Sequence, residues 1–328
     1  MNTPGIETRH QDAGPSTPAA VLVLLPVYNG GHYLAEQVES ILGQAGVHTV
    51  VLCRDDGSRD DSEQVLEGLS QRWPDRIERV RDSLGNLGAS GNFSRLMDLA
   101  LVFQMPAPFS GPVQYVALSD QDDVWHADKL RVCMTAIKRL ERAHPGRPAL
   151  IHSDLRVISD DGREIAPSMA RYQGLRTAHS GLAAQALSNT VTGCTSLMNR
   201  QLLELGLPVP AEAIMHDWWL SMVASALGAR TYLDQALIDY RQHERNAIGA
   251  KSKDENPREK RLLKRLAGFF DQRHRQIFDL NARQAGAFLR RYRKQLSIGQ
   301  TMILRAITLL AWPIPPLQRS IYLVLRRL

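Results

Sequence analysis

Cysteine is scarce in this sequence. Cys53, Cys133 and Cys194 are widely spaced, odd in number and form no CxxC pair in a chain of 328 residues. This usage argues against a disulfide framework and a structural zinc site, and it indicates a reducing compartment. Each cysteine is therefore expected to be a small core residue rather than a nucleophile.

Long apolar runs are also missing. No segment reaches the roughly 18 uncharged apolar residues that a spanning helix needs. Residues 1–18 are polar and rich in Pro, Gly, Ser and Thr, so a disordered leader is predicted. The apolar run 19–27 lacks a basic flank before it and a small-residue cleavage site after it, and it is interpreted as a buried strand rather than a secretory signal.

The glycine signatures of two common nucleotide-binding folds are lacking as well. Gly30 and Gly31 are adjacent, and Gly85, Gly88 and Gly91 follow the spacing GxxGxxG. Neither fits GxGxxG at the opening of the first helix, and no GxxxxGK[ST] occurs. The sequence therefore does not predict a dinucleotide or P-loop site.

Positive charge is concentrated at one end of the chain. The net charge is +6, and residues 257–328 hold sixteen Lys and Arg against three Asp and Glu, so the rest of the chain is net acidic. This asymmetry indicates one localised anionic partner surface rather than a nucleic-acid partner. With 44% hydrophobic residues, the chain is long enough for one large domain or a domain with an appendage.

The sequence does contain a dense acidic motif, within YVALSDQDDVW. Val113–Leu118 has the length and β-branched content of a buried strand, so Asp120, Asp122 and Asp123 should lie where that strand ends. The three acids repel one another, and Mg²⁺ or Mn²⁺ removes the repulsion because these cations prefer carboxylate oxygens and are often shared with substrate phosphates. We interpret Asp120 and Asp122 as a metal and diphosphate site. The alternative is an acidic turn that caps the next helix, which could be the whole role of Asp123.

Strand and helix patterns alternate along the first part of the chain. Strands are predicted at 21–25, 47–53, 77–80 and 113–118, and helices at 33–42, 58–69, 93–103 and 128–142. This alternation predicts an α/β domain with a mostly parallel sheet and helices on both faces. Beyond it the parallel rhythm ends, with short strands at 149–153, 155–158, 163–165, 191–198 and 236–241 and helices at 199–206 and 215–227.

A polar motif follows each of the first four predicted strands. The motifs are Tyr28-Asn29, Asp55-Asp56, residues 86–92 and residues 120–123. In a parallel sheet the carboxyl ends of the strands meet at one edge, where ligands bind. If these motifs were only solvated turns, they would have no reason to lie at the same edge of the sheet. Their shared position therefore favours a metal site.

The order of the motifs PVYN, DDGS, NxG, SDQDDVW, TGC, HDWWL and YRQH resembles the inverting family 2 glycosyltransferases with a GT-A fold. That family uses nucleotide sugars and a divalent metal. SDQDDVW, HDWWL and YRQH are similar to motifs of the bacterial rhamnosyltransferases that build lipopolysaccharide and other surface glycans. The resemblance covers about residues 21–249 and implies a GT-A domain at 19–250, a nucleotide-binding, mostly parallel sheet flanked by helices, followed by a basic helical extension at 251–328.

The resemblance also implies where the nucleotide lies. Val27, Tyr28 and Asp56 would contact the base, and Asp55 would support that loop. The residues near the nucleotide and donor sugar would be Asn86, Gly88 and Gly193, with Cys194 as small filler.

For the metal, the resemblance implies three residues. Asp120 would approach the ribose or the ion, and Asp122 would ligate Mg²⁺ or Mn²⁺ beneath the diphosphate. His243, near the end of the resembling region, would be a further ligand of the metal or diphosphate. Histidine readily serves as a ligand or as a solvated surface residue, so a plain surface role is the alternative.

The acceptor hydroxyl must lose its proton as it attacks, which requires one positioned carboxylate. Asp217 is the candidate, because a helix begins there and its dipole favours the ionised form; a simple helix-capping role is the alternative. Many members of the family carry Glu where this chain has His216, so the role of His216 is left open. Trp218 and Trp219 are adjacent and cannot both face the same way, so one is expected to pack in the core and the other to line the acceptor cleft.

The resemblance implies transfer of L-rhamnose from dTDP-β-L-rhamnose to a glycan or lipid-linked acceptor, with a UDP- or GDP-sugar donor, a nucleotidyltransferase and a non-catalytic binding protein as alternatives. In the tail, Lys and Arg alternate with apolar residues such as Leu304, Ile307 and Leu310, which is typical of a helix lying on an anionic membrane. A cytoplasmic protein, peripheral on the inner face of the membrane, is expected. A basic helical pair packed on the domain or on a partner is the alternative.

Overall fold

A computed structural model of the chain describes residues 19–175, 177, 181–243 and 272–327. The predicted leader at 1–18 lies outside the described residues, as do 251–271 of the predicted tail. Within the C-terminal segment 272–327, side chains are described from residue 276 onward.

The first part of the chain alternates strands and helices, as the sequence predicted. Its elements are β1 (Ala19–Val27), α1 (Gly31–Leu42), β2 (Val47–Asp55), α2 (Ser62–Arg72), β3 (Ile77–Arg79), α3 (Gly88–Val102), β4 (Gln104–Met105), β5 (Gly111–Pro112), β6 (Tyr115–Leu118), β7 (Val124–Trp125) and α4 (Lys129–Ala143). Strands β3, β2, β1 and β6 are neighbours in that order, and all three pairings are parallel. The predicted parallel half-sheet is confirmed.

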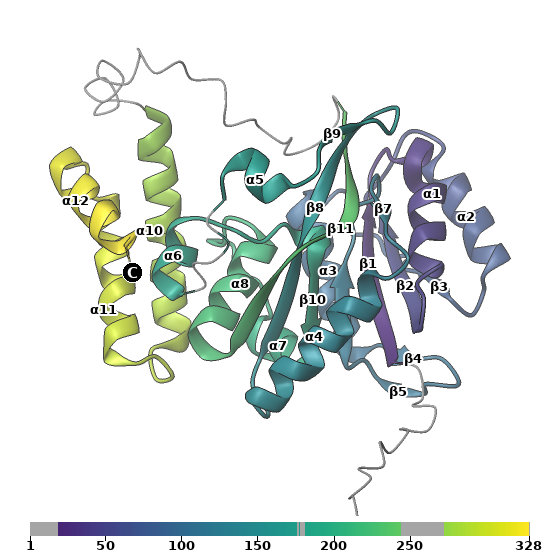
Figure 1. Cartoon of the computed structure of the whole chain (residues 1–328), viewed down its shortest axis with the longest axis horizontal. Coiled ribbons are helices and arrows are strands. Elements are labelled where there is room, and N and C mark those ends of the chain that lie inside the picture. The colour runs from purple at the N-terminus through teal and green to yellow at the C-terminus, as the bar shows by residue number, and fades with distance from the viewer. Residues whose placement is uncertain (1–18, 176, 178–180, 244–271, 328) are drawn as a thin grey trace, which may run out of the picture.

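The second part of the chain completes a nine-stranded mixed sheet (Figure 1). Its elements are β8 (Ala149–Ser159), β9 (Glu164–Ala166), α5 (Met169–Gln173), α6 (Leu182–Leu187), η1 (Gly193–Thr195), β10 (Ser196–Asn199), α7 (Arg200–Gly206), α8 (His216–Leu227), β11 (Ala229–Gln242), α10 (Gln272–Tyr292), α11 (Ile298–Thr308), η3 (Leu309–Ala311) and α12 (Pro315–Leu325). Strand β10 is antiparallel to both β6 and β8, while β11 runs parallel to β8 and antiparallel to β7.

Four predicted elements were wrong in detail. The strands predicted at 149–153 and 155–158 are one strand, β8, because the polar residue between them, Asp154, is satisfied by hydrogen bonds from Ser168 Oγ and the Ala170 amide. The strand predicted at 191–198 begins only at Ser196, since the amide of Thr195 bonds back to the Thr192 carbonyl in a 3₁₀ turn. The helix predicted at 93–103 already begins at residue 88.

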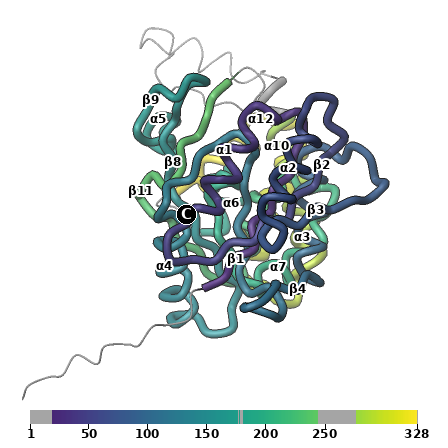
Figure 2. Tube along the Cα trace, turned by 90° about the vertical axis from the view of Figure 1, so that its right-hand side faces the viewer, coloured from purple at the N-terminus to yellow at the C-terminus, as the bar shows by residue number. Residues whose placement is uncertain are grey.

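The sheet separates two hydrophobic layers. Successive residues of a strand face opposite sides, and in β1 Leu22 and Leu24 join one cluster while Val21 and Val23 join the other. In the side view of Figure 2, α4 lies on one side of β1, and α3 and α7 lie on the other. The three free cysteines are buried, which confirms their interpretation as core residues.

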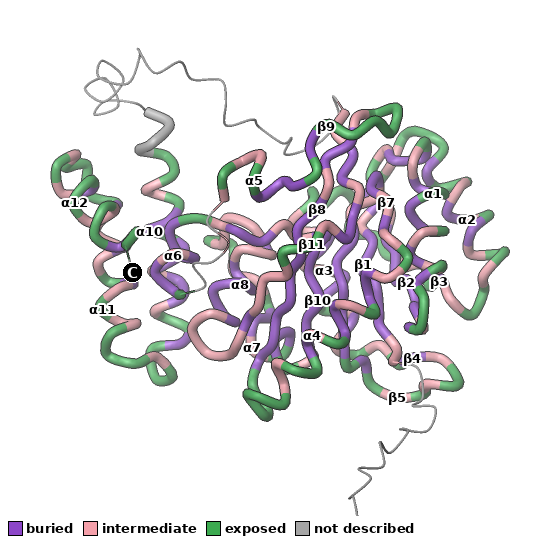
Figure 3. Tube along the Cα trace, viewed as in Figure 1, coloured by how far each residue is buried: buried purple, intermediate pink, exposed green. Residues whose placement is uncertain are grey.

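The C-terminal helices α10, α11 and α12 stand together beside α6 and α8 (Figure 1). Phe288 and Tyr292 of α10 pack against Trp219 of α8, with ring centroids 5.2 and 5.9 Å from the indole. Burial follows the same pattern in Figure 3, where the helix faces turned to the domain are buried and the outer faces are exposed. The alternative prediction, helices packed on the domain, therefore describes α10 and α11.

This packing corrects the lipid-facing assignment of three tail residues. Leu304, Ile307 and Leu310 are fully buried in the cluster that also contains Trp219 and Leu220. Helical periodicity identifies an apolar face but not the surface that covers it. No helix among the described residues combines the length and apolar character needed to cross a bilayer.

Replacing Trp219 by alanine is expected to destabilise the protein by about 3–5 kcal/mol. The indole is fully buried, donates a hydrogen bond to the Gly206 carbonyl at 2.8 Å and joins α8 to α10, so its loss leaves a cavity and an unpaired acceptor. Trp312→Ala is the matched control, because that indole is 57% exposed and should cost less than about 0.5 kcal/mol. Urea denaturation measures both; equal costs would contradict the described packing.

Candidate active site

The carboxyl ends of several strands meet at one edge of the sheet. Strand β1 pairs in parallel with both β2 and β6, so the loops that follow these three strands leave the sheet side by side. The short strand β7, directly after the acidic motif, pairs with the last part of β11. This pairing brings the end of β11 to the same edge, as required if the predicted site residues are to form one site.

Hydrogen bonds hold the loops of this edge together. The Asn29 amide donates to Ser58 Oγ and the Arg59 amide donates to Asn29 Oδ1, both at 2.8 Å. The Gln121 side chain accepts from the Tyr28 amide at 2.8 Å and donates to the Tyr28 carbonyl at 3.0 Å. The loop after β1 is thus tied both to the loop after β2 and to the acidic motif.

Asp56 organises the next loop. It is buried, and its carboxylate accepts hydrogen bonds from the backbone amides of Leu87 and Gly88, each at 2.8 Å, and from Arg54 at 2.6 Å. The Asn86 side chain donates to the Asp56 carbonyl at 2.9 Å. The structure therefore brings Asn86 and Gly88 to the end of β2, and α3 begins at residue 88 because Asp56 satisfies its first amides.

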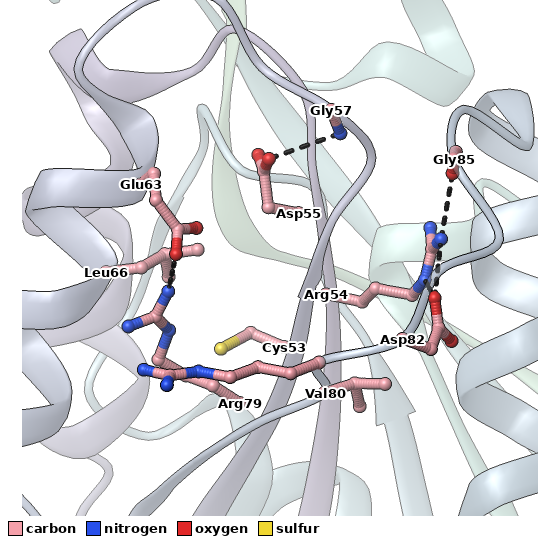
Figure 4. Close-up of a pocket in the computed structure, with 11 residues that line it drawn as sticks. Cys53, Arg54, Asp55, Gly57, Glu63, Leu66, Arg79, Val80, Asp82 and Gly85 are labelled. Carbon is pink, nitrogen blue, oxygen red and sulfur yellow. Dashed lines mark hydrogen bonds and ion pairs between the residues drawn. The ribbon is translucent and has the colours of Figure 1, made fainter.

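A pocket of about 260 Å³ opens beside these loops, between β2, β3 and the segment at 81–85 (Figure 4). Asp55 lines it and accepts hydrogen bonds from the Gly57 and Ser58 amides. Arg79, paired with Glu63, forms another part of the lining. Of the other residues predicted to contact the base, Val27 is fully buried, whereas Tyr28 is exposed at the edge.

The acidic motif is crowded and poorly solvated. Burial, together with the neighbouring Asp122 charge, raises the pKa of Asp120 to about 7. Burial also raises the pKa of Asp122, and it raises that of Asp123 well above the usual value. Asp123 Oδ1 accepts from the Arg241 amide at 3.3 Å, so Asp123 does not cap α4, and its Oδ2 is buried without a hydrogen-bond partner in the part of the chain that the structure describes.

His243 lies within hydrogen-bonding distance of the acidic motif. Its Nε2 is 3.0 Å from Asp122 Oδ2, and its ring stacks on Tyr33 with centroids 5.0 Å apart. Asp120, Asp123 and Cys194 also place ligand atoms within 4.8 Å of one another. The Asp122 carboxylate and the His243 imidazole are thus neighbours although they are far apart in the sequence, whereas the cluster of ligand atoms within 4.8 Å contains Asp120 with Asp123 and Cys194.

Asp217 lies beside Gly193, in the first turn of α8. Burial raises its pKa to about 6, while hydrogen bonds from the Trp218 amide, Asn189 and the Gly193 backbone act in the opposite direction. The charge of Asp217 contributes to the raised pKa of Asp120, so the two carboxylates belong to one electrostatic site. Trp219 is the core member of the tryptophan pair, and Trp218 is half-buried.

Two basic residues near the acids received no role from the sequence. Arg241 donates to the Asp122 carbonyl at 3.2 Å and pairs with Glu36 at 2.9 Å, which ties the motif to α1. Lys129 is fully buried, with its ammonium 3.2 Å from the Trp125 ring centroid. Because Arg241 lies within the motif YRQH, the sequence could have indicated that it belongs to the site. The sequence around Lys129 contains no pattern that indicates its burial.

The site combines two kinds of chemical group. Carboxylates and an imidazole, which can together hold a hard cation, lie at the ends of β6 and β11. A separate carboxylate, Asp217, has a pKa close to neutrality and can accept a proton. Such a site suits the transfer of a group away from a diphosphate.

Solved structures share this fold over nearly the whole chain. TarS 1-349 of S. aureus in complex with UDP matches with a TM-score of 0.52 and 14% identity, covering 94% of this chain and 91% of that one. Its complex with UDP-GlcNAc matches with a TM-score of 0.51 and 13% identity, covering 94% and 92%. The fold is the GT-A fold of glycosyltransferases, which confirms the predicted fold class.

The family follows from the sequence itself. The model of the family described as Glycosyl transferase family 2 matches residues 22–204, and the chain belongs to that family. It is thus a transferase that moves a sugar from a nucleotide sugar.

Two curated relatives are similar over most of their length. The dTDP-rhamnosyl transferase RfbG of Shigella flexneri is 25% identical over 229 residues, which cover 69% of this chain and 74% of the relative. The putative teichuronic acid biosynthesis glycosyltransferase TuaG of Bacillus subtilis is 25% identical over 228 residues, covering 67% and 78%.

Proposed function

We propose that the protein transfers L-rhamnose from dTDP-β-L-rhamnose, with inversion and with the help of a divalent metal, to a hydroxyl of a glycan or lipid-linked acceptor in cell-surface polysaccharide synthesis. The similarity to a dTDP-rhamnosyl transferase supports the choice of donor. The observation that carries the proposal is the placement of one carboxylate, Asp217, apart from the acidic motif but within its electrostatic reach.

The donor would lie along the edge formed by the loops after β1, β2 and β3. The base would occupy the pocket beside Asp55, with Val27, Tyr28 and Asp56 shaping the adjoining loops. The diphosphate would extend towards the acidic motif. The residues that would border the nucleotide and the sugar are Asn86, Gly88, Asp120 and Gly193.

The chemistry of the donor set fits Mg²⁺ or Mn²⁺. We assign the ion to Asp120, Asp122 and His243, which supply carboxylate oxygens and an imidazole. Cys194 fits less well, because burial raises its pKa well above the usual value and keeps the thiol protonated. When bound, the cation would offset the negative charge of the departing diphosphate, so that no protein acid is needed there.

Asp217 would act as the base on the acceptor side. The acceptor hydroxyl attacks the anomeric carbon, its proton passes to a carboxylate oxygen of Asp217, and the bond from the anomeric carbon to the phosphate oxygen breaks. Direct attack by one nucleophile inverts the anomeric centre. A β-linked nucleotide rhamnose therefore gives an α-rhamnoside.

A dependence of the rate on pH follows from the environment of Asp217. Its pKa of about 6 means that the carboxylate is ionised above pH 6 and protonated below. Transfer should be nearly constant from about pH 7 upward and should fall tenfold per pH unit below about pH 6. The profile of kcat/KM at saturating metal measures this; a rate that rises as the pH falls would contradict the assignment.

We also propose that the protein is cytoplasmic and binds the inner face of the membrane through exposed apolar and basic side chains of α11, of α12 and of the segment between them. Met302, Trp312 and Val324 are 65%, 57% and 61% exposed, and this end of the chain carries the large excess of Lys and Arg. Deletion of the tail is an unsuitable test, because α10 and α11 complete the hydrophobic core.

Trp312→Glu combined with Val324→Glu should instead weaken co-sedimentation with vesicles of anionic phospholipid. The reason is that both substitutions remove apolar surface and add negative charge. Val102→Glu is the matched control, since Val102 is 72% exposed but lies on α3. Equal sedimentation of all three proteins would exclude this surface.

The donor is tested with a panel of radiolabelled nucleotide sugars and acceptors extracted with lipid solvents. The proposal predicts incorporation from dTDP-rhamnose and an α-linkage in the product. Incorporation only from a UDP- or GDP-linked sugar would retain the enzyme class but overturn the donor. Release of pyrophosphate from a nucleoside triphosphate and a sugar phosphate would instead indicate a nucleotidyltransferase.

A further inference from the structure

His216, the first residue of α8, has an unusual environment. Its side chain is only 2% exposed, and neither ring nitrogen has a hydrogen-bond partner within the described part of the chain. The ring stacks on Phe93 with centroids 4.3 Å apart and planes inclined by 27°. An unpaired polar group in the interior costs free energy, so a core position of this kind needs a compensating role.

The charge state of the ring defines what it can do. Burial lowers the pKa of His216 to about 3, so the imidazole is neutral at physiological pH. In the neutral ring one nitrogen donates a hydrogen bond and the other accepts one. A group that binds protons so weakly is unsuited to take the proton of the acceptor, which leaves that role to Asp217.

Gly193 shows which space the ring adjoins. A Cβ built on Gly193 would lie 3.5 Å from His216 Nε2, 3.5 Å from Asp217 Oδ2 and 3.6 Å from Asp217 Cβ. These are ordinary van der Waals distances, so the Gly193 backbone lies beside His216 Nε2 and Asp217, and a methyl group there would touch both side chains without displacing them. Gly193 itself is partly exposed, so a ligand can contact its backbone next to these two side chains.

We propose that His216 Nε2 hydrogen-bonds a hydroxyl group of the donor sugar and thereby helps to select the sugar. The inference rests on the proposed function, because it needs a sugar beside Asp217. Sugar hydroxyls both donate and accept, and a neutral imidazole matches either direction without adding charge beside the base. The donor is favoured over the acceptor because the ring packs on Phe93 of α3, the helix that begins at the Asn86–Gly88 loop of the donor side.

The test compares ligands with and without the sugar. His216→Phe keeps a flat ring that can stack on Phe93 but removes both ring nitrogens. Isothermal titration with Mn²⁺ present should show that dTDP binds the variant within twofold of the wild type, whereas dTDP-rhamnose binds about tenfold more weakly, the effect of one lost hydrogen bond. His216→Gln, which restores an amide donor and acceptor, should recover part of the loss.

Gly193→Ala provides a second variant that does not alter the histidine. The added methyl makes only ordinary contacts, so the protein should fold, but it occupies the space beside His216 Nε2 and should weaken dTDP-rhamnose selectively. An equal loss for dTDP and dTDP-rhamnose in His216→Phe would identify His216 as a packing residue and overturn the inference. Unchanged donor binding with a raised KM for the acceptor would overturn it as well. If wild-type protein does not bind dTDP-rhamnose at all, the proposed donor itself fails.

Discussion

Asp217→Asn is expected to reduce the rate of transfer by about 10²–10⁴-fold, while binding of the nucleotide sugar is retained. Asparagine has nearly the same shape as aspartate and can still accept a hydrogen bond from the Trp218 amide, but it cannot take a proton from the acceptor. The effect should therefore appear in kcat, measured at saturating donor, and not in the donor Kd measured by calorimetry.

The same substitution should not destabilise the protein. Because burial raises the pKa of Asp217 to about 6, the ionised form is disfavoured in the folded state, and its contribution to stability is lost as the pH rises through 6. Asparagine carries no charge and avoids this loss. Between pH 5 and pH 8 the free energy of unfolding of the variant should therefore be larger than that of the wild type. Asp234→Asn, at an exposed aspartate paired with Arg171, is the control and should leave the rate unchanged. Retained turnover in Asp217→Asn would remove the residue from the role of base.

Asp122→Asn should weaken binding of Mn²⁺ in the presence of a nucleoside diphosphate by about 100-fold or more. The substitution removes a charged oxygen ligand and also alters the contact with His243 Nε2, which lies 3.0 Å from Asp122 Oδ2. Transfer should fall with it and should recover in part at high metal concentration, since the defect lies in affinity.

Asp128→Asn is the matched control for this experiment. Asp128 is close in sequence, but its carboxylate is exposed and pairs with Arg131 on α4. Calorimetric titration of Mn²⁺ into each protein with a nucleoside diphosphate present separates the two. If both variants bind Mn²⁺ as the wild type does, Asp122 is not a ligand.

The parallel half of the sheet could be predicted because its signals are local. Each strand is a continuous apolar run bounded by Gly, Asn or Asp, and the loops that follow β1, β2 and β6 must leave the sheet at the same edge. The meeting of Asp55, Asp120 and Asp122 at one edge follows from this topology. The approach of His243 to Asp122 does not, since it depends on β11 pairing with β7, and only the motif resemblance indicated it.

Other features depend on contacts between distant segments. The side chain of Gln121 bridges to Tyr28, and the buried ammonium of Lys129 lies against Trp125, yet neither residue carries a local pattern that signals this. In the tail, the apolar spacing of Leu304 and Ile307 was read correctly as a helix face. The sequence did not reveal what covers this helix face, because a helix that lies on a membrane and a helix that packs on a hydrophobic core have the same spacing of apolar residues.

The most direct test of the account is calorimetric titration of the wild-type protein with dTDP in the presence and absence of Mn²⁺. A diphosphate site made from crowded aspartates predicts tight binding with the ion and little or none without it, because the uncompensated acids repel the phosphates. Equal binding under both conditions, or none in either, would contradict the central claim that these carboxylates hold the donor through a cation.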